Sequence, residues 1–256
     1  MRIQKLVSLW LCAVLLLLPL SGCGTEEGVS TTEDGFPTRF DETTGTLTVS
    51  GEGVLGDLYP REWVPDDFGG FLKTIEENTT VKKLVLEEGI TQIDNCFNDM
   101  NALKEVVFPS TLSDIRRSFI SCTAMEELTI PENVKIIRDD SFSYCTSLSS
   151  LQLKGPKEIL HSAFDDLDSL CEVVIPDNSL LCNVFYKCYD LVEVIIGKGV
   201  TCHQVFAEMH STCWGSFAVS EPEEAKKRTF YLPKEQSETL NEGLVIYEWD
   251  KRVVLE

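Results

Sequence analysis

The feature that most constrains the fold of this chain is an internal repeat with a period of 21 to 23 residues. Each unit carries two apolar residues separated by one position, which is the spacing of side chains on one face of a β-strand. The pairs are Leu84/Leu86, Val106/Phe108, Leu128/Ile130, Leu151/Leu153, Val173/Ile175 and Val194/Ile196. A further apolar residue stands three positions before each pair. One unit cannot bury its own apolar face, so the repeat predicts stacked units that share a continuous core.

A phenylalanine follows the apolar pair in every unit. The six are Phe97, Phe119, Phe142, Phe164, Phe185 and Phe206. The first five stand nine residues before the next pair, whereas the interval from a pair to its phenylalanine varies between ten and twelve residues. The constant interval predicts a packed corner, and the variable one predicts the loop that absorbs insertions. Strands of successive units should lie side by side, about 4.8 Å apart, in a parallel sheet.

The regular count breaks once, because 24 residues separate Phe206 from the next strand start at Phe230. The excess falls around residues 209–227. Two interpretations remain open for it. The segment is either a degraded extra unit that uses Phe217 and Val219, or a protruding loop that exposes Trp214.

Two phrases connect the repeat to a known family. Residues 140–148 (DSFSYCTSL) and 125–131 (MEELTIP) resemble the BspA-type leucine-rich repeat, which reads roughly AF-x-x-C-x-x-L-x-x-I-x-I-P. The resemblance covers about residues 41–240, with a similar N-terminal cap at 45–53 and a similar last repeat at 229–235. It implies a right-handed solenoid of the α/β leucine-rich-repeat type, with a parallel sheet on one face and mostly loops and short helical turns elsewhere. It also implies surface proteins that bind macromolecules, often in adhesion to host components, without catalysis.

The first residues indicate export. Arg2 and Lys5 precede the apolar run 6–20, which is too short to span a bilayer comfortably and is typical of a secretory signal. It ends in Leu-Ser-Gly-Cys23, which resembles the lipobox of bacterial lipoproteins. The resemblance implies that Cys23 receives a diacylglycerol and that cleavage falls before it, which would anchor the protein on the extracellular face of the bacterial membrane through lipid alone.

These signals predict a domain order. We expect a lipoprotein signal peptide at 1–22, a flexible tether at 23–40, an N-terminal cap at 41–80, the solenoid at 81–232 with its insertion at about 209–227, and a C-terminal cap at 233–256. Loss of Arg2 and Lys5 with the signal would change the net charge from −20 to −22. Such acidity argues against nucleic acid and against electrostatic adhesion to anionic lipid.

The cysteines and histidines favour structural roles over chemistry. Cys122, Cys145 and Cys188 share a repeat position with methionine and leucine, which predicts small buried hydrophobes. Counting three residues back from each phenylalanine gives Asp94, Arg116, Asp139, His161, Cys182 and His203. The last three would form a column, but parallel side chains do not converge as zinc ligands must. A Cys182–Cys202 disulfide is a minor alternative. No HExxH, GxSxG, P-loop or GxGxxG motif occurs, so we expect no enzyme, metal or cofactor.

The outward positions of the strands give the candidate binding surface. The residue inside each apolar pair should point away from the core: Val85, Val107, Thr129, Gln152, Val174 and Ile195. The residue before each pair forms a second column: Lys83, Glu105, Glu127, Ser150, Glu172 and Glu193. Glutamates on adjacent strands repel each other, which favours selection for a basic, partly apolar partner. The insertion residues Trp214 and Phe217 are the alternative docking site.

Three functions compete at this point. The first is an interaction protein that binds a protein or glycan at the cell surface. The second is a structural component of the envelope without a soluble ligand, and the third is an enzyme or metal carrier. The oligomeric state is not predicted by the sequence.

Overall fold

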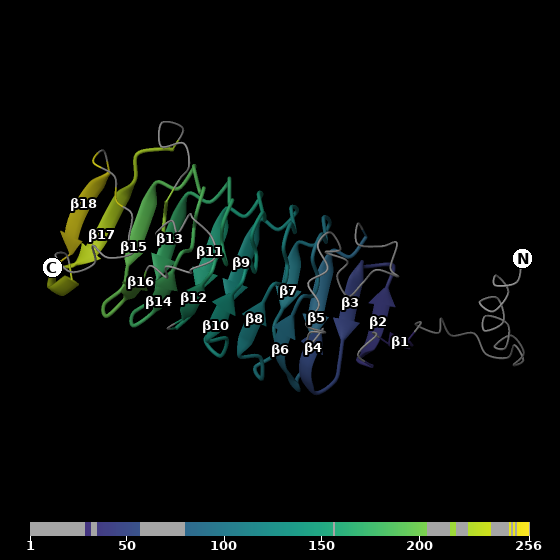
Figure 1. Cartoon of the computed structure of the whole chain (residues 1–256). Helices are drawn as coiled ribbons and strands as arrows, with labels where there is room; N and C mark the ends of the chain where they lie inside the picture. Colours follow the sequence, from purple (N-terminus) through teal and green to yellow (C-terminus); the bar gives the residue numbers. More distant parts are fainter. Residues whose placement is uncertain are drawn as a thin grey trace, which may run out of the picture.

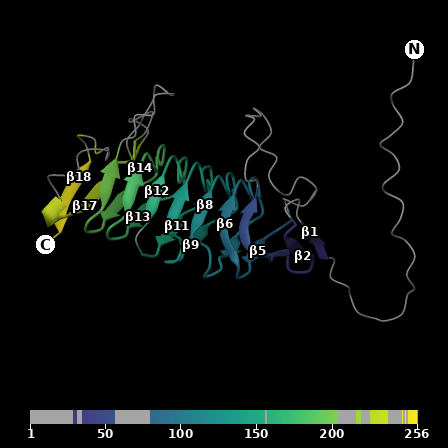
Figure 2. The same ribbon diagram turned by 60° about the horizontal axis from the view of Figure 1, so that its bottom comes forward.

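The computed structural model describes residues 29–31, 35–56, 80–155, 157–203, 216–218, 225–236, 246, 248 and 250–255. The described chain coils into an elongated solenoid, with β1 and β2 near one end and β18 at the other (Figure 1). Each turn of the coil contributes one strand to each of two rows, and Figure 2 shows these rows as separate layers. We call them the front face and the back sheet.

The front face holds the strands that the repeat predicts, together with β3 (Thr46–Val49) and β18 (Lys251–Leu255) from the segments predicted as caps. The others are β5 (Lys83–Leu86), β7 (Glu105–Val107), β9 (Glu127–Ile130), β11 (Ser150–Leu153), β13 (Glu172–Ile175), β15 (Glu193–Ile196) and β17 (Thr229–Pro233). Neighbouring strands that pair along this row are parallel. The apolar pairs of β5, β9, β13 and β15 point inward and are buried, as their alternation predicts.

The back sheet was not predicted. Its strands are β4 (Gly53–Gly56), β6 (Ile90–Asp94), β8 (Asp114–Arg116), β10 (Ile136–Arg138), β12 (Glu158–Leu160), β14 (Leu180–Cys182) and β16 (Thr201–His203). From β8 onward each is three residues long and has a buried apolar residue at its centre, such as Ile115 or Ile137, whereas β6 buries both Ile90 and Ile93. Neighbouring strands are parallel. A strand with one inward residue leaves no period-two pattern, so the spacing of apolar residues does not indicate a sheet on this side.

The predicted short helical turns are also wrong. Within the described ranges, the one helix is the 3-10 turn η1 (Lys234–Gln236), which lies outside the regular repeats. The corner after β6 has positive φ at alternate residues, 54° at Asn95, 61° at Phe97 and 58° at Asp99. Its amides bond to the next unit, as Asp99 N–H does to the Ile120 carbonyl at 2.8 Å. An α-helix needs those amides for bonds within its own turn, so the stacking of units replaces helix formation.

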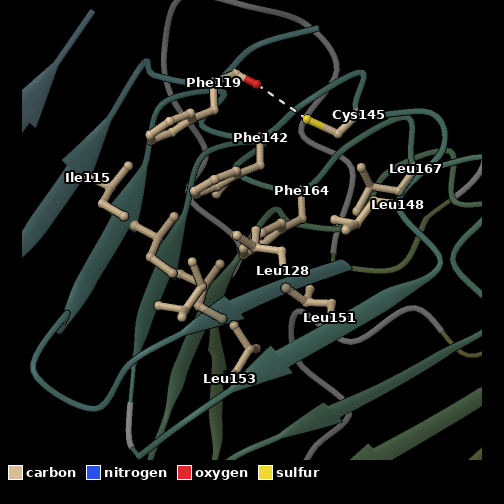
Figure 3. Packing of buried hydrophobic residues seen from close by; sticks show 14 of the residues in the cluster. Ile115, Phe119, Leu128, Phe142, Cys145, Leu148, Leu151, Leu153, Phe164 and Leu167 are labelled. Atoms are coloured by element: carbon tan, nitrogen blue, oxygen red, sulfur yellow. Dashed lines mark hydrogen bonds between the residues drawn. The ribbon is translucent and has the colours of Figure 1, made fainter. Parts of the chain in front are cut away.

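A row of phenylalanine rings fills the core between the two layers. Successive rings stack with centroids 5.0 to 5.5 Å apart from Phe97 to Phe185. Figure 3 shows three of these rings in a row, with Ile115 of the back sheet on one side. The next ring is Phe217, which is fully buried and lies 5.1 Å from the ring of Phe185. Phe217 therefore takes the place that the spacing assigned to Phe206, which lies outside the described residues.

The position of Phe217 shows which part of the insertion belongs to the core. Most of its extra residues fall between β16 and Phe217, in the segment that the spacing had identified as variable. Four more fall after Phe217, which stands 13 residues before Phe230 instead of nine, so the corner that was expected to be constant is longer in this unit. Phe217 belongs to the core and is not available for docking, in contrast to the alternative binding site of the sequence analysis. Trp214 and Val219 lie outside the described residues.

A row of thiols accompanies the rings. Cys122, Cys145 and Cys188 are buried, and each Sγ–H donates to the carbonyl of the phenylalanine in the preceding unit at 3.3 to 3.4 Å. Figure 3 shows this bond between Cys145 and Phe119. The prediction of small buried hydrophobes with free thiols is confirmed for all three.

The predicted column of His161, Cys182 and His203 is wrong in its register. Leu160 pairs with Cys182, which pairs with His203, and His161 lies one residue beyond the strand. The cause is one extra residue between the end of the back-sheet strand and the phenylalanine in the units of Phe142 and Phe164. Cys182 and Cys202 are both thiols rather than a disulfide. The described residues contain no group of side chains that could hold a metal ion.

The two ends of the solenoid differ from the predicted boundaries. β1 (Val29–Thr31) and β2 (Pro37–Asp41) pair antiparallel, and β2 continues antiparallel onto β3, so part of the expected tether at 23–40 is sheet. Phe36 and Thr38 are buried there, which explains why this segment adds to the fold. At the other end β18 pairs parallel with β17 and extends the front face. Residues 1–28, with Cys23, lie outside the described chain. No helix among the described residues is long and apolar enough to cross a membrane.

Candidate binding site on the front face

The predicted apolar column lies on the outer surface of the front face. Pairing places Val85 beside Val107, Thr129 beside Gln152, and Val174 beside Ile195. Val107 and Val174 are the most exposed apolar members of the column, at 39% and 45%. The structure continues this column to Thr48, Tyr231 and Val253, which the sequence analysis missed. The alternation Phe-Tyr-Leu in residues 230–232 was a usable signal for Tyr231.

The acidic column is arranged differently from the expectation. Glu105 is neutralised by Lys83, whose Nζ lies 2.7 Å from its Oε1. No pairing register joins Glu105 to Glu127, which pairs with Ser150 instead. The like-charged neighbours in register are Glu172 and Glu193. Electrostatic repulsion on this face is therefore concentrated on β13 and β15, rather than on β7 and β9.

Strand pairing on the front face is interrupted twice among the described strands, between β7 and β9 and between β11 and β13. The residue that follows each apolar pair explains the position of these two breaks. Where this residue has an N–H, it donates to the preceding unit, as Lys154 does to the Ile130 carbonyl at 3.0 Å and Gly197 to the Ile175 carbonyl at 2.9 Å. Pro131 and Pro176 stand at this position in the units that follow the two breaks, and proline has no N–H to donate.

Proline at this position also shortens the strand pairing in other units. Pro109 follows the apolar pair of the β7 unit, and Pro233 ends β17. The pairings of β7 and β17 with their preceding strands extend over three positions. Pairings into β5, β11 and β15, whose strands are followed by other residues, extend over four. The proline that closes the repeat consensus therefore weakens the front face at every unit that carries it.

The break between β7 and β9 opens into a cleft of about 460 Å³. Its lining consists of Lys104, Glu105, Val106, Ala124, Glu126, Glu127, Leu128 and Thr129. Val106, which lines the cleft, and the nearby Phe108 are partly exposed, whereas Leu84 and Leu86 at the same positions of the preceding unit are 0% and 2% exposed. Phe108 is larger than the leucine or isoleucine of other units, and its ring meets that of Phe119 edge-on at 6.0 Å. The cleft thus reaches the apolar core.

One wall of this cleft carries an unused backbone acceptor. In other units the equivalent carbonyl receives two amides: Lys82 accepts from Lys104 and Glu105, and Glu126 accepts from Ser149 and Ser150. The carbonyl of Lys104 receives no hydrogen bond from any described residue. The cleft therefore presents a carbonyl oxygen together with the carboxylates of Glu126 and Glu127, all of which attract a cation or a donor.

The back sheet differs from the front face in its pairing and its outer charges. Its strands pair without interruption from β4 to β16, and ion pairs link their outer side chains. Asp94 is 3% exposed and lies 2.7 Å from Arg117 Nη2 and 3.8 Å from Arg116 Nη1, and Arg138 lies 2.8 Å from Asp114. Burial raises the pKa of Asp114, partly offset by Arg138. These ion pairs link neighbouring units across the back sheet, although Asp114 Oδ1 and Arg138 Nε are buried without a hydrogen-bond partner among the described residues.

Solved structures similar to this chain are bacterial leucine-rich-repeat proteins. A leucine-rich-repeat protein of Treponema pallidum is 18% identical, with a TM-score of 0.41 over 76% of this chain and 97% of that chain. A leucine-rich-repeat protein of Eubacterium ventriosum is 13% identical, with a TM-score of 0.25 over 80% and 78%. A leucine-rich cell surface protein of Faecalibacterium prausnitzii is 13% identical, with a TM-score of 0.24 over 89% and 94%. Curated proteins provide no match.

The repeats themselves identify the family. Residues 74–192 match the BspA type leucine rich repeat region in six copies. These residues include the front strands β5 to β13 and the packed corners with their phenylalanine and cysteine rows. The repeat region of this chain therefore belongs to the BspA-type leucine-rich-repeat family.

Proposed function

We propose that this protein acts at the bacterial cell surface and binds a basic, partly apolar surface of a protein partner through its front face. The observation that carries the proposal is the exposed apolar column with Val107 and Val174, flanked by glutamates on the same outer surface. Apolar side chains that form a continuous exposed patch rimmed by polar residues mark interaction surfaces, and the column supplies neighbouring apolar positions on adjacent strands. The net charge of −20 adds long-range attraction for a basic partner.

The cell-surface location is supported by the repeat family and by the first residues of the chain. The lipobox-like tetrad ending at Cys23 makes a lipid anchor part of the proposal. Replacing Cys23 with alanine should move the protein from the membrane fraction to the medium, or leave the signal uncleaved. Unchanged acyl labelling of the Cys23→Ala protein would rule out this anchor, whereas the proposed binding face would be unaffected.

The binding proposal is tested with charge variants of the front face. Changing Glu105, Glu127, Glu172 and Glu193 together to glutamine should weaken capture of the partner from host matrix, and raising the salt concentration should weaken capture by the unmodified protein. Thermal stability should stay the same or rise, because Glu172 and Glu193 then no longer repel each other. Undiminished capture by this variant would contradict the proposed face.

The competing function is a structural role in the bacterial envelope. Offering the protein both host matrix and its own cell envelope distinguishes the two functions. Retention by the envelope alone, independent of the four glutamates, would favour the structural role.

A further inference from the structure

We propose that the cleft between β7 and β9 receives a single lysine or arginine side chain from an extended segment of the partner. This proposal rests on the proposed binding function and specifies where on the front face the basic group is held. It follows from three observations, namely the missing strand pairing, the exposed core beneath it and the polar groups at its rim.

The apolar floor suits the aliphatic stem of such a side chain. The cleft volume of about 460 Å³ falls within the range of about 300–1,000 Å³ that is usual for ligand sites. Val106 and Phe108 are partly exposed at the break, and Leu128 lines it from β9. Lysine and arginine bury their methylene groups against such surfaces while their charged ends stay at the polar rim. A purely polar cation would leave this exposed core uncovered.

The rim suits the charged end. The side chains of Glu126 and Glu127 are exposed and make no hydrogen bond or ion pair with any described residue, whereas Glu105 is held by Lys83. The unused Lys104 carbonyl adds a third acceptor. Lys104 also lines the cleft, but the carboxylates of Glu126 and Glu127 outnumber its single ammonium group. The net negative charge of the rim selects a cationic end group over an anionic or neutral one.

The second break of the front face explains why the proposal concerns one cleft only. At the break between β11 and β13 the core residues Leu151 and Leu153 are 8% and 9% exposed and remain buried. Strand pairing is lost there as well, but the core beneath it stays closed. A missing proline amide is therefore not sufficient to open a cleft, and the large Phe108 distinguishes the first break from the second.

The experiment uses the full chain and two fluorescein-labelled pentapeptides. One has a central lysine between valine and alanine residues, and the other has norleucine in its place, which keeps the stem but removes the charge. Fluorescence anisotropy at low salt should show at least tenfold tighter binding of the lysine peptide. Equal binding of the two peptides, or no binding of the lysine peptide at millimolar concentration, would overturn the proposal.

Two variants localise the site. Changing Glu126 and Glu127 together to glutamine should weaken binding of the lysine peptide at least tenfold. Ala124→Phe fills the cleft without changing any charge, and should weaken binding to a similar extent. The charge-matched control changes Glu158 on the back sheet and Glu235 in η1 to glutamine, and should alter binding less than twofold. Circular dichroism melting confirms that each variant is folded.

The outcomes separate this proposal from the proposed function. Suppose that changing Glu172 and Glu193 to glutamine weakens peptide binding as much as changing Glu126 and Glu127, while Ala124→Phe has no effect. This result would mean that the face attracts the peptide by its overall charge, and it would contradict the cleft proposal but not the proposed function. If the four-glutamate variant also captures the macromolecular partner normally, the proposed function fails as well.

Discussion

The front face and the back sheet are built from the same repeats, yet they differ in continuity. Each unit supplies one strand to each layer, and both layers pack on the same row of phenylalanine rings. The back sheet pairs without interruption and links its outer side chains through ion pairs, whereas the front face is broken where Pro131 and Pro176 remove a donor. The comparison teaches that stability and recognition are divided between layers: the back sheet fixes the stack, which allows the front face to lose pairing and expose apolar groups.

The row of rings should be the largest single contributor common to both layers. Phe142 is fully buried and stacks on Phe119 and Phe164 at 5.0 and 5.5 Å. Phe142→Ala should lower the free energy of unfolding by about 3–5 kcal/mol, because the neighbouring units cannot collapse onto the cavity. Urea unfolding measures the change. A melting temperature within a few degrees of the unmodified protein would show that the two layers do not depend on a shared core.

The corner between the layers should make stability depend on pH. Burial raises the pKa of Asp165 to about 7, and its carboxylate accepts the Tyr186 amide of the next unit at 2.8 Å. The unfolded carboxyl group loses its proton near pH 4, whereas the folded one keeps it until about pH 7. The folded state therefore binds more protons across this window, and the free energy of unfolding falls as pH rises through it, by on the order of 2–4 kcal/mol.

This pH effect is tested by unfolding Asp165→Asn in urea at pH 4.5 and pH 8. The variant should lose most of the difference between the two values. Burial also raises the pKa of Asp140 and Asp166, so a small residual dependence of the same sign should remain. A stability that rises from pH 4.5 to pH 8 in the unmodified protein would contradict the assignment to Asp165.

Paired ion-pair variants compare the two layers directly. Asp94→Asn removes a nearly buried carboxylate from Arg117 on the back sheet, and should cost about 2 kcal/mol because the short ion pair with Arg117 is lost, whereas Arg116 keeps its ion pair with Asp139. Glu105→Gln removes the exposed pair with Lys83 on the front face, and should change stability by at most about 0.5 kcal/mol. Equal losses in urea unfolding would mean that the two layers share the electrostatic stabilisation.

Restoring an amide should repair the front face with the smallest change in stability. Pro131→Val supplies an N–H opposite the Phe108 carbonyl and should leave the free energy of unfolding within about 1 kcal/mol, because the new hydrogen bond offsets the greater freedom of the unfolded chain. Hydrogen exchange is the sensitive measurement. The amides of Glu127 and Thr129 face β7 by alternation, and should exchange more slowly in the variant.

The matched control for this repair is Pro176→Val at the second break. It should slow exchange on β13 without affecting β9. If exchange at Glu127 is unchanged by Pro131→Val, the size of Phe108 rather than the missing amide keeps β7 and β9 apart, and Phe108→Leu becomes the variant expected to close the cleft.

Local pattern was sufficient to predict the front strands, the ring row and the buried thiols, because each depends on spacing that recurs in every unit. It was insufficient for the back sheet, whose strands from β8 onward are three residues long with one buried apolar residue at the centre. A single extra residue in the units of Phe142 and Phe164 shifted His161 out of register with Cys182. Phe206 was predicted as the ring of the last unit in place of Phe217, because the inserted residues change the spacing on which the prediction relied.

The candidate binding site was also predicted only in part from the sequence. Alternation along the strands predicted the outer columns with Val107, Val174 and the glutamates, because side chains on a strand must alternate between core and solvent. The cleft was not predictable from the pattern, although Pro131 and Phe108 are both visible in the sequence. Its opening depends on how a large ring packs against Phe119 and on which neighbouring carbonyl is left unpaired.

The sequence by itself determined that the chain forms stacked units with a shared core, because its apolar residues recur at a fixed period that no single unit could bury. Only the tertiary structure decided that the units form two sheets rather than one, which ring completes the row after Phe185, and where the front face opens. The physical reason is that pairing and packing between units are set by contacts across about 22 residues, whereas a sequence pattern reports the preferences of each unit alone.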